Sequence, residues 1–179
     1  GWQLLTSNFQ RSEAPVAILA SPLPSIAVPQ ATGEVAKAVT VTSYDPLGDN
    51  QENADQALLA IDSDNETAWT TASYNKSDMS GKAGVGLLVD LGVEKEVYSV
   101  EIDFISAGHT AEIYVVNSTE PDFATELKFG DTNPNESSSE ISSTDPVSGR
   151  YVLVWLTPDL PEAESGEFQG GISEIKVRL

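Results

Sequence analysis

The sequence has no cysteine, one histidine and few basic residues. Without cysteine there can be no disulfide framework, no thiolate metal site and no thiol nucleophile. Lysine and arginine together number 9, against 28 aspartates and glutamates, so the formal net charge is −19. A chain with this charge is repelled by nucleic acid and by anionic membrane surfaces. We therefore expect neither as a partner.

A long hydrophobic run is also missing. No window approaches the roughly 18 apolar residues that a membrane-spanning helix needs. Because the chain begins with glycine rather than methionine, we expect it to be the soluble part of a longer protein, which contacts the membrane only through a segment upstream of Gly1. Its 179 residues, 40% of them hydrophobic, suffice for one sandwich-sized core.

Residues 1–35 differ in composition from the rest of the chain. Prolines 15, 22, 24 and 29 disfavour a helix and favour an extended path. One interpretation is a flexible, membrane-proximal linker. The segment also carries more apolar residues than a solvated linker needs, so the other interpretation is that part of it lies along the domain that follows: Val16, Ile18, Leu19, Leu23, Ile26 and Val28. We place the domain itself at residues 36–179.

Residues 36–179 have the pattern of an all-β domain. Apolar and polar residues alternate most clearly over 98–104, and residues 150–157 are apolar on both faces, as in a strand covered on both sides. The predicted strands are 38–43, 84–91, 98–104, 111–117, 124–129, 150–157 and 173–179. A short helical turn capped by Asn53 or Asp55 is predicted at 55–60, and a mobile loop at 132–145. Short strands without a long helix favour a β-sandwich or jelly roll.

Two acidic loops contain possible ligands for a cation. Residues 60–69 read Ala-Ile-Asp-Ser-Asp-Asn-Glu-Thr-Ala-Trp and bring Asp62, Asp64 and Thr67 into one loop. Calcium prefers roughly six to eight oxygen ligands, and this loop can supply several. The alternative is a solvated turn that bends the chain without a metal. Asp45, Asp49 and Glu52 form a competing site in the preceding loop.

Three patches together resemble the discoidin-like family, also called galactose-binding-like or coagulation-factor C-type domains. Residues 60–69 are similar to the family pattern Ala-Ile-Asp-Gly-Asp-x-x-Thr-x-Trp, with Ser63 in the place of glycine. The other two patches are Gly-Leu-Leu-Val-Asp-Leu-Gly at 86–92 and Ser-Glu-Ile-Lys-Val at 173–177. The resemblance implies a β-sandwich and a structural calcium held by Asp62, Asp64, Thr67 and Glu174.

A narrower resemblance concerns residues 42–49 with 52–53, and residues 84–87 and 150–157. They are similar to the extracellular C-terminal domain of actinobacterial MviN/MurJ-like proteins, in which a part resembling a lipid II flippase is joined to a pseudokinase. This resemblance implies a location on the extracellular face of a bacterial cell membrane and a link to peptidoglycan synthesis.

Related sugar-binding modules hold their ligand on loops at one end of the sandwich. The corresponding candidates are Tyr74, Asn75, His109 and Phe168. His109, between Gly108 and Thr110, is predicted to lie in an exposed hairpin turn. We assign Trp69 and Trp155 to the core, with sugar stacking as the alternative.

Catalysis is not expected, because the chain has one histidine, no nucleophile-elbow pattern and no glycine-rich phosphate cradle. The sequence favours a non-catalytic binding module for a cell-wall glycan or a peptidoglycan precursor. The alternative is a protein-interaction or spacer domain with an envelope protein as its partner.

Overall fold

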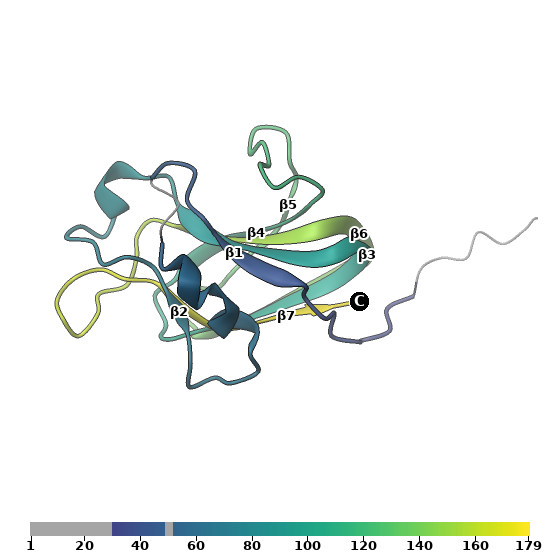
Figure 1. Cartoon of the computed structure of the whole chain (residues 1–179), viewed down its shortest axis with the longest axis horizontal. Helices are drawn as coiled ribbons and strands as arrows, with labels where there is room; N and C mark the ends of the chain where they lie inside the picture. The colour runs from purple at the N-terminus through teal and green to yellow at the C-terminus, as the bar shows by residue number, and fades with distance from the viewer. Residues whose placement is uncertain (1–29, 49–51) are drawn as a thin grey trace, which may run out of the picture.

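The described part of the chain folds into two layers of β-strands with two short 3₁₀ helices (Figure 1). The computed structural model describes residues 30–48 and 52–179. In chain order the elements are β1 (Thr40–Tyr44), η1 (Ala54–Ile61), β2 (Trp69–Thr70), η2 (Met79–Gly81), β3 (Val85–Phe104), β4 (Thr110–Val116), β5 (Lys128–Asp131), β6 (Ser138–Thr157) and β7 (Gly171–Arg178). The all-β sandwich predicted from the sequence is confirmed.

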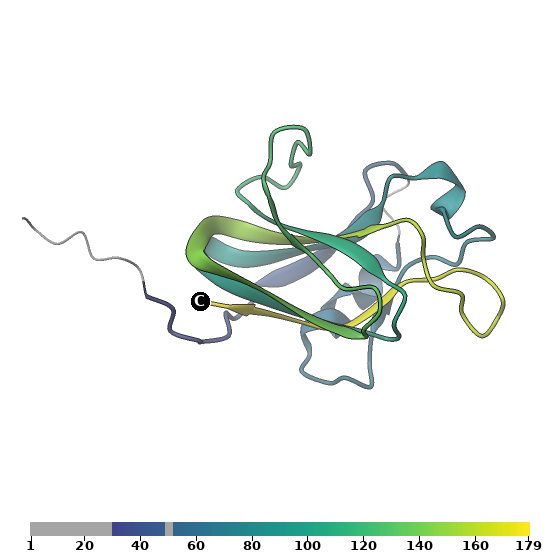
Figure 2. The same ribbon diagram turned by 180° about the vertical axis from the view of Figure 1, so that it is seen from behind.

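The two longest strands, β3 and β6, belong to both layers. In the first layer, the first half of β3 lies between β1 and the second half of β6, and β4 and β5 follow. In the second layer, the second half of β3 pairs with β7 and with the first half of β6, and β2 pairs with β7. The β3–β6 register shifts between Asp90 and Lys95 and between Val97 and Ser99. Near these shifts both strands curve from one layer into the other (Figures 1 and 2).

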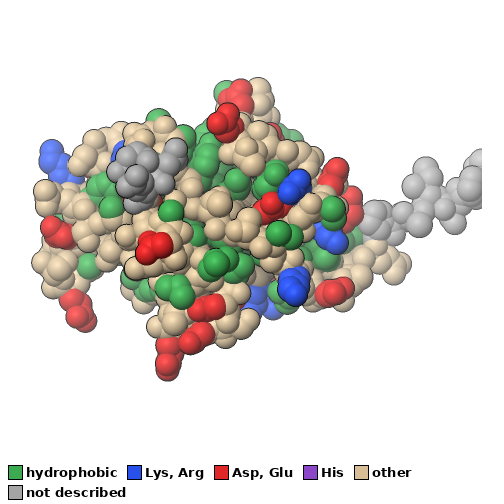
Figure 3. All heavy atoms as spheres, in the orientation of Figure 1, with side chains coloured by type: hydrophobic (Ala, Val, Ile, Leu, Met, Phe, Trp, Pro, Cys, Tyr) green, Lys and Arg blue, Asp and Glu red, His purple; other side chains and the backbone are tan. Residues whose placement is uncertain are grey.

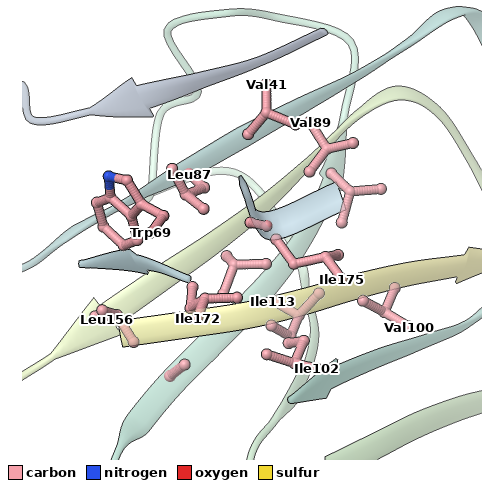
Figure 4. Packing of buried hydrophobic residues seen from close by; sticks show 14 of the residues in the cluster. Val41, Trp69, Leu87, Val89, Val100, Ile102, Ile113, Leu156, Ile172 and Ile175 are labelled. Carbon is pink, nitrogen blue, oxygen red and sulfur yellow. The ribbon is translucent and has the colours of Figure 1, made fainter. Parts of the chain in front are cut away.

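Side-chain alternation divides the first layer into an inner and an outer face. Val41, Val89, Val152 and Val115 occupy directly opposed positions on neighbouring strands and form one row of the inner face. The inner face packs with the second layer and η1 into the main core, which also holds Trp69, Leu87, Ile102, Ile113 and Ile172 (Figure 4). Each such buried side chain contributes roughly 1.5–3 kcal/mol to folding.

Several predicted elements differ from the structure. The segments 84–91 and 98–104, predicted as separate strands, are parts of β3, because residues 95–97 stay paired with β6. The predicted loop at 132–145 is wrong from Ser138 onward, where β6 begins. Its serines pair with β3 through backbone hydrogen bonds, which do not depend on the low strand propensity of their side chains.

Two further boundaries need correction. The strand predicted at 124–129 begins only at Lys128, because Asp122 stabilises a turn by accepting from the backbone N–H groups of Ala124 and Glu126, each at 2.9 Å. The helical turn predicted at 55–60 is η1, but Asn53 does not cap it through its side chain. The Asn53 amide instead donates to the Thr70 carbonyl at 2.8 Å and so ties η1 to β2.

The described part of the N-terminal segment lies against β7. The backbone N–H groups of Thr32 and Gly33 donate to the Leu179 carbonyl, each at 2.8 Å, and that of Ala36 donates to the Val177 carbonyl at 2.7 Å. Pairing with the sandwich therefore begins before the boundary predicted after residue 35. The prolines and apolar residues of 1–29 lie outside the described residues. Among the helices of residues 30–48 and 52–179, none has the length and apolarity to cross a bilayer.

Candidate functional site

The outer face of the first layer carries a row of large side chains. Tyr44 of β1, Gly86 of β3, Trp155 of β6 and Glu112 of β4 occupy directly opposed positions, so they share one face of the sheet. Gly86 places no side chain between Tyr44 and Trp155, whose rings meet edge to face with centroids 5.7 Å apart. The neighbouring row holds Leu88, Leu153 and Tyr114, which form with Trp155 and Val116 a second apolar cluster outside the main core.

A further aromatic ring covers this face from the loop between β4 and β5. The Phe123 ring lies 4.9 Å from that of Trp155 and 5.2 Å from that of Tyr114, measured between centroids. The loop projects from the first layer on the side away from η1 (Figures 1 and 2). Phe123 is 36% exposed, whereas Trp155 is 4% exposed. Phe123 is therefore the most exposed ring of the cluster, in which Tyr44 and Tyr151 are partly buried.

Together these side chains line a hollow of about 580 Å³. We call it the aromatic groove; its lining includes Tyr44, Glu112, Tyr114, Phe123, Trp155 and Thr157. The Tyr114 hydroxyl donates to Glu112 at 2.7 Å, and Lys128 approaches the same carboxylate at 3.1 Å. Burial and the hydrogen bond to Glu112 raise the pKa of Tyr114 to about 12, so the phenol stays protonated. The groove thus combines aromatic rings with carboxylate and hydroxyl oxygens at its edge.

Three of the predicted ligand residues lie on two neighbouring loops. Tyr74 and Phe168 form an isolated β-bridge, with two backbone hydrogen bonds of 2.8 Å each. Both rings are partly buried against the main core, while Asn75 is exposed beside them. The structure therefore brings Tyr74, Asn75 and Phe168 together, and their role in binding stays a prediction.

The prediction that His109 lies exposed in a hairpin turn is wrong. The imidazole is completely buried, and its ring stacks on Phe104 with centroids 4.5 Å apart. The backbone N–H of Gly171 donates to Nε2 at 2.9 Å, which ties the loop before β4 to the start of β7. The residue joins two parts of the fold and presents no surface to a ligand.

The competing cation site predicted at Asp45, Asp49 and Glu52 holds a lysine instead. Asp45 and Glu52 are almost fully buried, and each lies 3.2 Å from the Lys82 ammonium. The Tyr74 hydroxyl also contacts this ammonium, at 3.1 Å, and donates to Glu52. Partial burial acts to lower the pKa of Lys82, but the hydrogen bonds that its ammonium donates to Tyr74, Asp45 and Glu52 raise it. One ammonium therefore lies against both carboxylates and balances part of their charge within the protein; Asp49 lies outside the described residues.

The other acidic loop brings Asp62, Thr67 and Glu174 together. The Thr67 hydroxyl donates to Asp62, and the backbone N–H of Ser63 donates to Glu174 at 3.0 Å. Ser63 has a φ of 62° and so takes the left-handed conformation that the family glycine would adopt. Asp64 instead accepts from the backbone N–H of Glu66 at 2.9 Å.

The pKa values of Glu174 and Asp62 are shifted in opposite directions. Burial raises the pKa of Glu174, the Ser63 hydrogen bond opposes this rise, and the Asp62 charge adds to it. Hydrogen bonds from Thr67 and from the Asp64 backbone lower the pKa of Asp62. Among the described residues, no group of three or more acidic, histidine or cysteine side chains could hold a metal. A cation here would also need the Thr67 hydroxyl and backbone carbonyls as ligands, which calcium accepts.

The two tryptophans assigned to the core have different surroundings. Trp69 is fully buried, and its indole N–H donates to the Glu52 carbonyl at 2.7 Å. Trp155 is also buried, but on the outer face, where it borders the aromatic groove. Sequence reasoning missed Tyr44, Glu112, Tyr114 and Phe123 as site residues. The signal was the alternation of Glu112 and Tyr114 along one strand, together with a lone phenylalanine in a polar loop.

No protein-family model matches the sequence. The CBM32 of AlyQ, solved in complex with 4,5-unsaturated mannuronic acid, is similar in structure, with 19% identity, a TM-score of 0.54 and coverage of 80% of this chain and 97% of that one. Chitosan-binding module 1 of a chitosanase/glucanase from Paenibacillus sp. IK-5 has 19% identity and a TM-score of 0.55, with coverage of 78% of this chain and 93% of that one. A pectin-binding module has 17% identity and a TM-score of 0.54, with coverage of 79% of this chain and 91% of that one. The chain therefore has the discoidin-like β-sandwich fold that its sequence predicted.

Proposed function

We propose that this chain is a non-catalytic module that binds a glycan in the aromatic groove. The observation that carries the proposal is the grouping of Tyr44, Phe123 and Trp155 around one hollow of about 580 Å³. A sugar ring presents its C–H face to an aromatic ring, and Glu112 and Thr157 supply oxygens for its hydroxyl groups. The shared fold of modules whose names state binding to chitosan and to pectin supports this function.

The position of the histidine supports a role without catalysis. Histidine is the side chain most often used as a general acid or base. The one histidine of this chain is completely buried, and both of its ring nitrogens contact backbone groups. It is thus removed from any surface at which a substrate could bind.

For the ligand, we propose a cell-wall glycan or a peptidoglycan precursor, bound on the extracellular face of a bacterial cell membrane. The resemblance of residues 42–49 with 52–53, 84–87 and 150–157 to the outer domain of MviN/MurJ-like proteins supports this location, with a membrane anchor outside residues 1–179. Acidic side chains are spread over the face shown in Figure 3. A net charge of −19 repels anionic wall polymers, so a neutral or amino-bearing glycan fits better.

A structural calcium is a further part of the proposal. Asp62, Thr67 and Glu174 would hold it together with carbonyls of the 62–67 loop, and the Asp64 carbonyl is near, since it accepts from the Thr67 hydroxyl at 3.0 Å. The ion would offset the repulsion between Asp62 and the buried Glu174. Its role would be to fix the loop to β7, away from the aromatic groove.

The test compares the wild type with Phe123→Ala and Leu127→Ala on a panel of wall fragments and defined glycans. Leu127 lies on the same loop and is 87% exposed, but it does not line the groove, so Leu127→Ala is a matched control. We expect Phe123→Ala to weaken binding roughly tenfold, as loss of a central aromatic contact does. Leu127→Ala should bind like the wild type.

Other outcomes would move the site or change the function. Wild-type affinity in Phe123→Ala, combined with weakened binding in Asn75→Ala, would place the ligand on the loops of Tyr74 and Phe168. Failure of the wild type to bind any glycan would favour the protein-interaction or spacer function. The observation favouring that alternative is that two exposed apolar side chains, Leu47 (56% exposed) and Phe123 (36% exposed), line the same groove.

A further inference from the structure

The aromatic groove continues into a second hollow on the outer face of the first layer. This second hollow, of about 470 Å³, shares Tyr44, Pro46 and Pro121 with the groove. Its other lining residues are Thr42, Ser43, Leu88, Thr119 and Glu120. We call the two hollows together the trough.

The trough crosses the strands of the first layer. Its lining begins on β4 with Glu112 and Tyr114, passes over β6 and β3, and reaches β1 at Thr42. Three spacings between neighbouring strands amount to roughly 14 Å. This length exceeds that of one sugar ring, so the trough fits a chain of linked sugars better than a single terminal sugar.

All charged side chains that line the trough are acidic among the described residues: Glu112, Glu120 and Asp122. Glu112 is partly neutralised by Lys128, whereas Glu120 and Asp122 are exposed on the loop that forms one wall. The pKa of Tyr44, at the floor of the trough, is raised mainly by burial and further by the charge of Glu120. The Glu120 carboxylate therefore acts on this ring electrostatically. Carboxylates without a lining cation attract positive charge and repel negative charge.

The aromatic lining favours the same kind of ligand. An ammonium group is attracted to the face of a tryptophan, tyrosine or phenylalanine ring by roughly 0.5–2 kcal/mol. Tyr44 and Phe123 both contact Trp155, so the rings and the carboxylates of the wall border one space. A sugar with a free amino group can use both at once, whereas a neutral or an acidic sugar cannot.

We infer that the trough binds an internal stretch of a linear glycan whose sugars carry free amino groups. This inference rests on the proposed function and specifies its ligand class and its mode of binding. The rings of Tyr44 and Phe123, which pack on the buried Trp155, contact the sugar faces, while Glu120 and Asp122 contact the amino groups. Affinity then grows with chain length until the trough is filled.

The test is calorimetric titration of the whole chain with glucosamine oligomers of increasing length. N-acetylglucosamine oligomers and glucose oligomers of the same lengths serve as comparison ligands. We expect the glucosamine trimer to bind roughly tenfold more tightly than glucosamine itself and than the N-acetylated trimer. Added salt should reduce this preference, because the attraction between exposed charges is screened.

The variant Glu120→Gln with Asp122→Asn locates the effect. Asn at 122 keeps an oxygen that can accept from the Ala124 backbone N–H, as Asp122 does at 2.9 Å. We expect this double variant to lose the preference for glucosamine oligomers, with an unchanged melting temperature. Glu126→Gln, on the same loop but outside the lining, is the matched control and should keep the preference.

Each of the other possible results would overturn one feature of the proposed binding. Equal affinity for all three oligomer series would overturn the amino-group preference and leave the proposed glycan function standing. Equal affinity for monomer and trimer would overturn binding of an internal stretch. A preference that survives in the double variant would overturn the location. Absence of binding to every oligomer and to the wall-fragment panel would instead overturn the proposed function itself.

Discussion

The Nε2 atom of His109 accepts a hydrogen bond from the backbone N–H of Gly171 at 2.9 Å. The other ring nitrogen, Nδ1, lies 2.8 Å from the Ser106 carbonyl, which can only accept. The proton therefore sits on Nδ1 and the buried ring is neutral. A second proton on Nε2 would face the Gly171 donor and break the bond. Burial lowers the pKa of His109 to about 4, although the Ser106 carbonyl acts in the opposite direction.

This arrangement predicts a loss of stability in mild acid. The pKa of histidine falls from 6.5 to about 4 on folding, so between these values the unfolded chain binds a proton that the folded chain does not. The free energy of unfolding should fall as pH drops through this window, by up to about 3 kcal/mol from this residue. His109→Gln keeps an acceptor but does not titrate. Urea unfolding at a series of pH values should therefore show a shallower decline for the variant, and parallel curves would contradict the assignment.

Because Asp45 and Glu52 are buried beside Lys82, we predict that replacing this lysine strongly lowers the free energy of unfolding. Lys82→Met removes the ammonium that lies 3.2 Å from each carboxylate and leaves two acids close together without a cation. Breaking a buried ion pair in this way costs roughly 3–5 kcal/mol. The free energy of unfolding in urea measures this loss.

Lys128→Met is the matched control for Lys82→Met. Lys128 also contacts two carboxylates, Glu112 and Asp131, each at 3.1 Å, but it is 39% exposed. Exposed ion pairs contribute roughly 0–1 kcal/mol. Equal losses of stability in the two variants would show that the Lys82 cluster is not effectively buried.

The fold could be predicted because its signals are local. Alternation over 98–104 and the apolar residues of 150–157 indicate strands whatever their partners are, and Val100, Ile102 and Val154 are indeed buried. Sequence alone could not show that 84–91 and 98–104 belong to one strand, since the curve depends on register shifts against β6. The strand beginning at Ser138 was missed because its partner β3, rather than its own side chains, holds it in place.

The candidate site depended on register still more strongly. Tyr44, Trp155 and Glu112 come from distant parts of the chain and meet only because each strand pairs in one register. A shift of one residue would turn each side chain to the other face. His109 was misplaced for a similar reason, since a polar residue flanked by glycine and threonine indicates a turn, and only the packing against Phe104 and Gly171 buries it.

We predict that position 86 tolerates no residue other than glycine. A Cβ atom built there lies 2.0 Å from the Val154 carbonyl oxygen on the paired strand. Neither backbone can move without breaking the ladder, so Gly86→Ala should cost several kcal/mol, at or above the roughly 1–3 kcal/mol typical of overpacking. In Gly166→Ala the added Cβ meets no atom within 4 Å, and only a φ of 84° opposes it. Urea midpoints should therefore fall much further for Gly86→Ala, and similar midpoints would contradict the β3–β6 register.

Because Asp62 lies near Glu174, we predict that the melting temperature of Glu174→Gln relative to the wild type depends on calcium. Glu174 is 4% exposed, and its pKa is raised by burial and by the Asp62 charge. A raised carboxyl pKa means that ionisation at neutral pH opposes folding. In a chelating buffer Glu174→Gln should therefore melt at or above the wild-type temperature, because the amide keeps an oxygen for the Ser63 N–H.

Calcium should reverse this order. A bound ion stabilises the folded state by about 2.7 kcal/mol at a hundredfold excess over its dissociation constant. The wild type should then melt at a higher temperature in millimolar calcium than after chelation, whereas Glu174→Gln and Asp62→Ala should gain little. Magnesium at the same concentration is the control, because it demands a tighter octahedral site. A wild-type melting temperature that is the same in calcium and in chelator would leave Asp62 and Glu174 as a loop brace made only by the Ser63 and Thr67 hydrogen bonds.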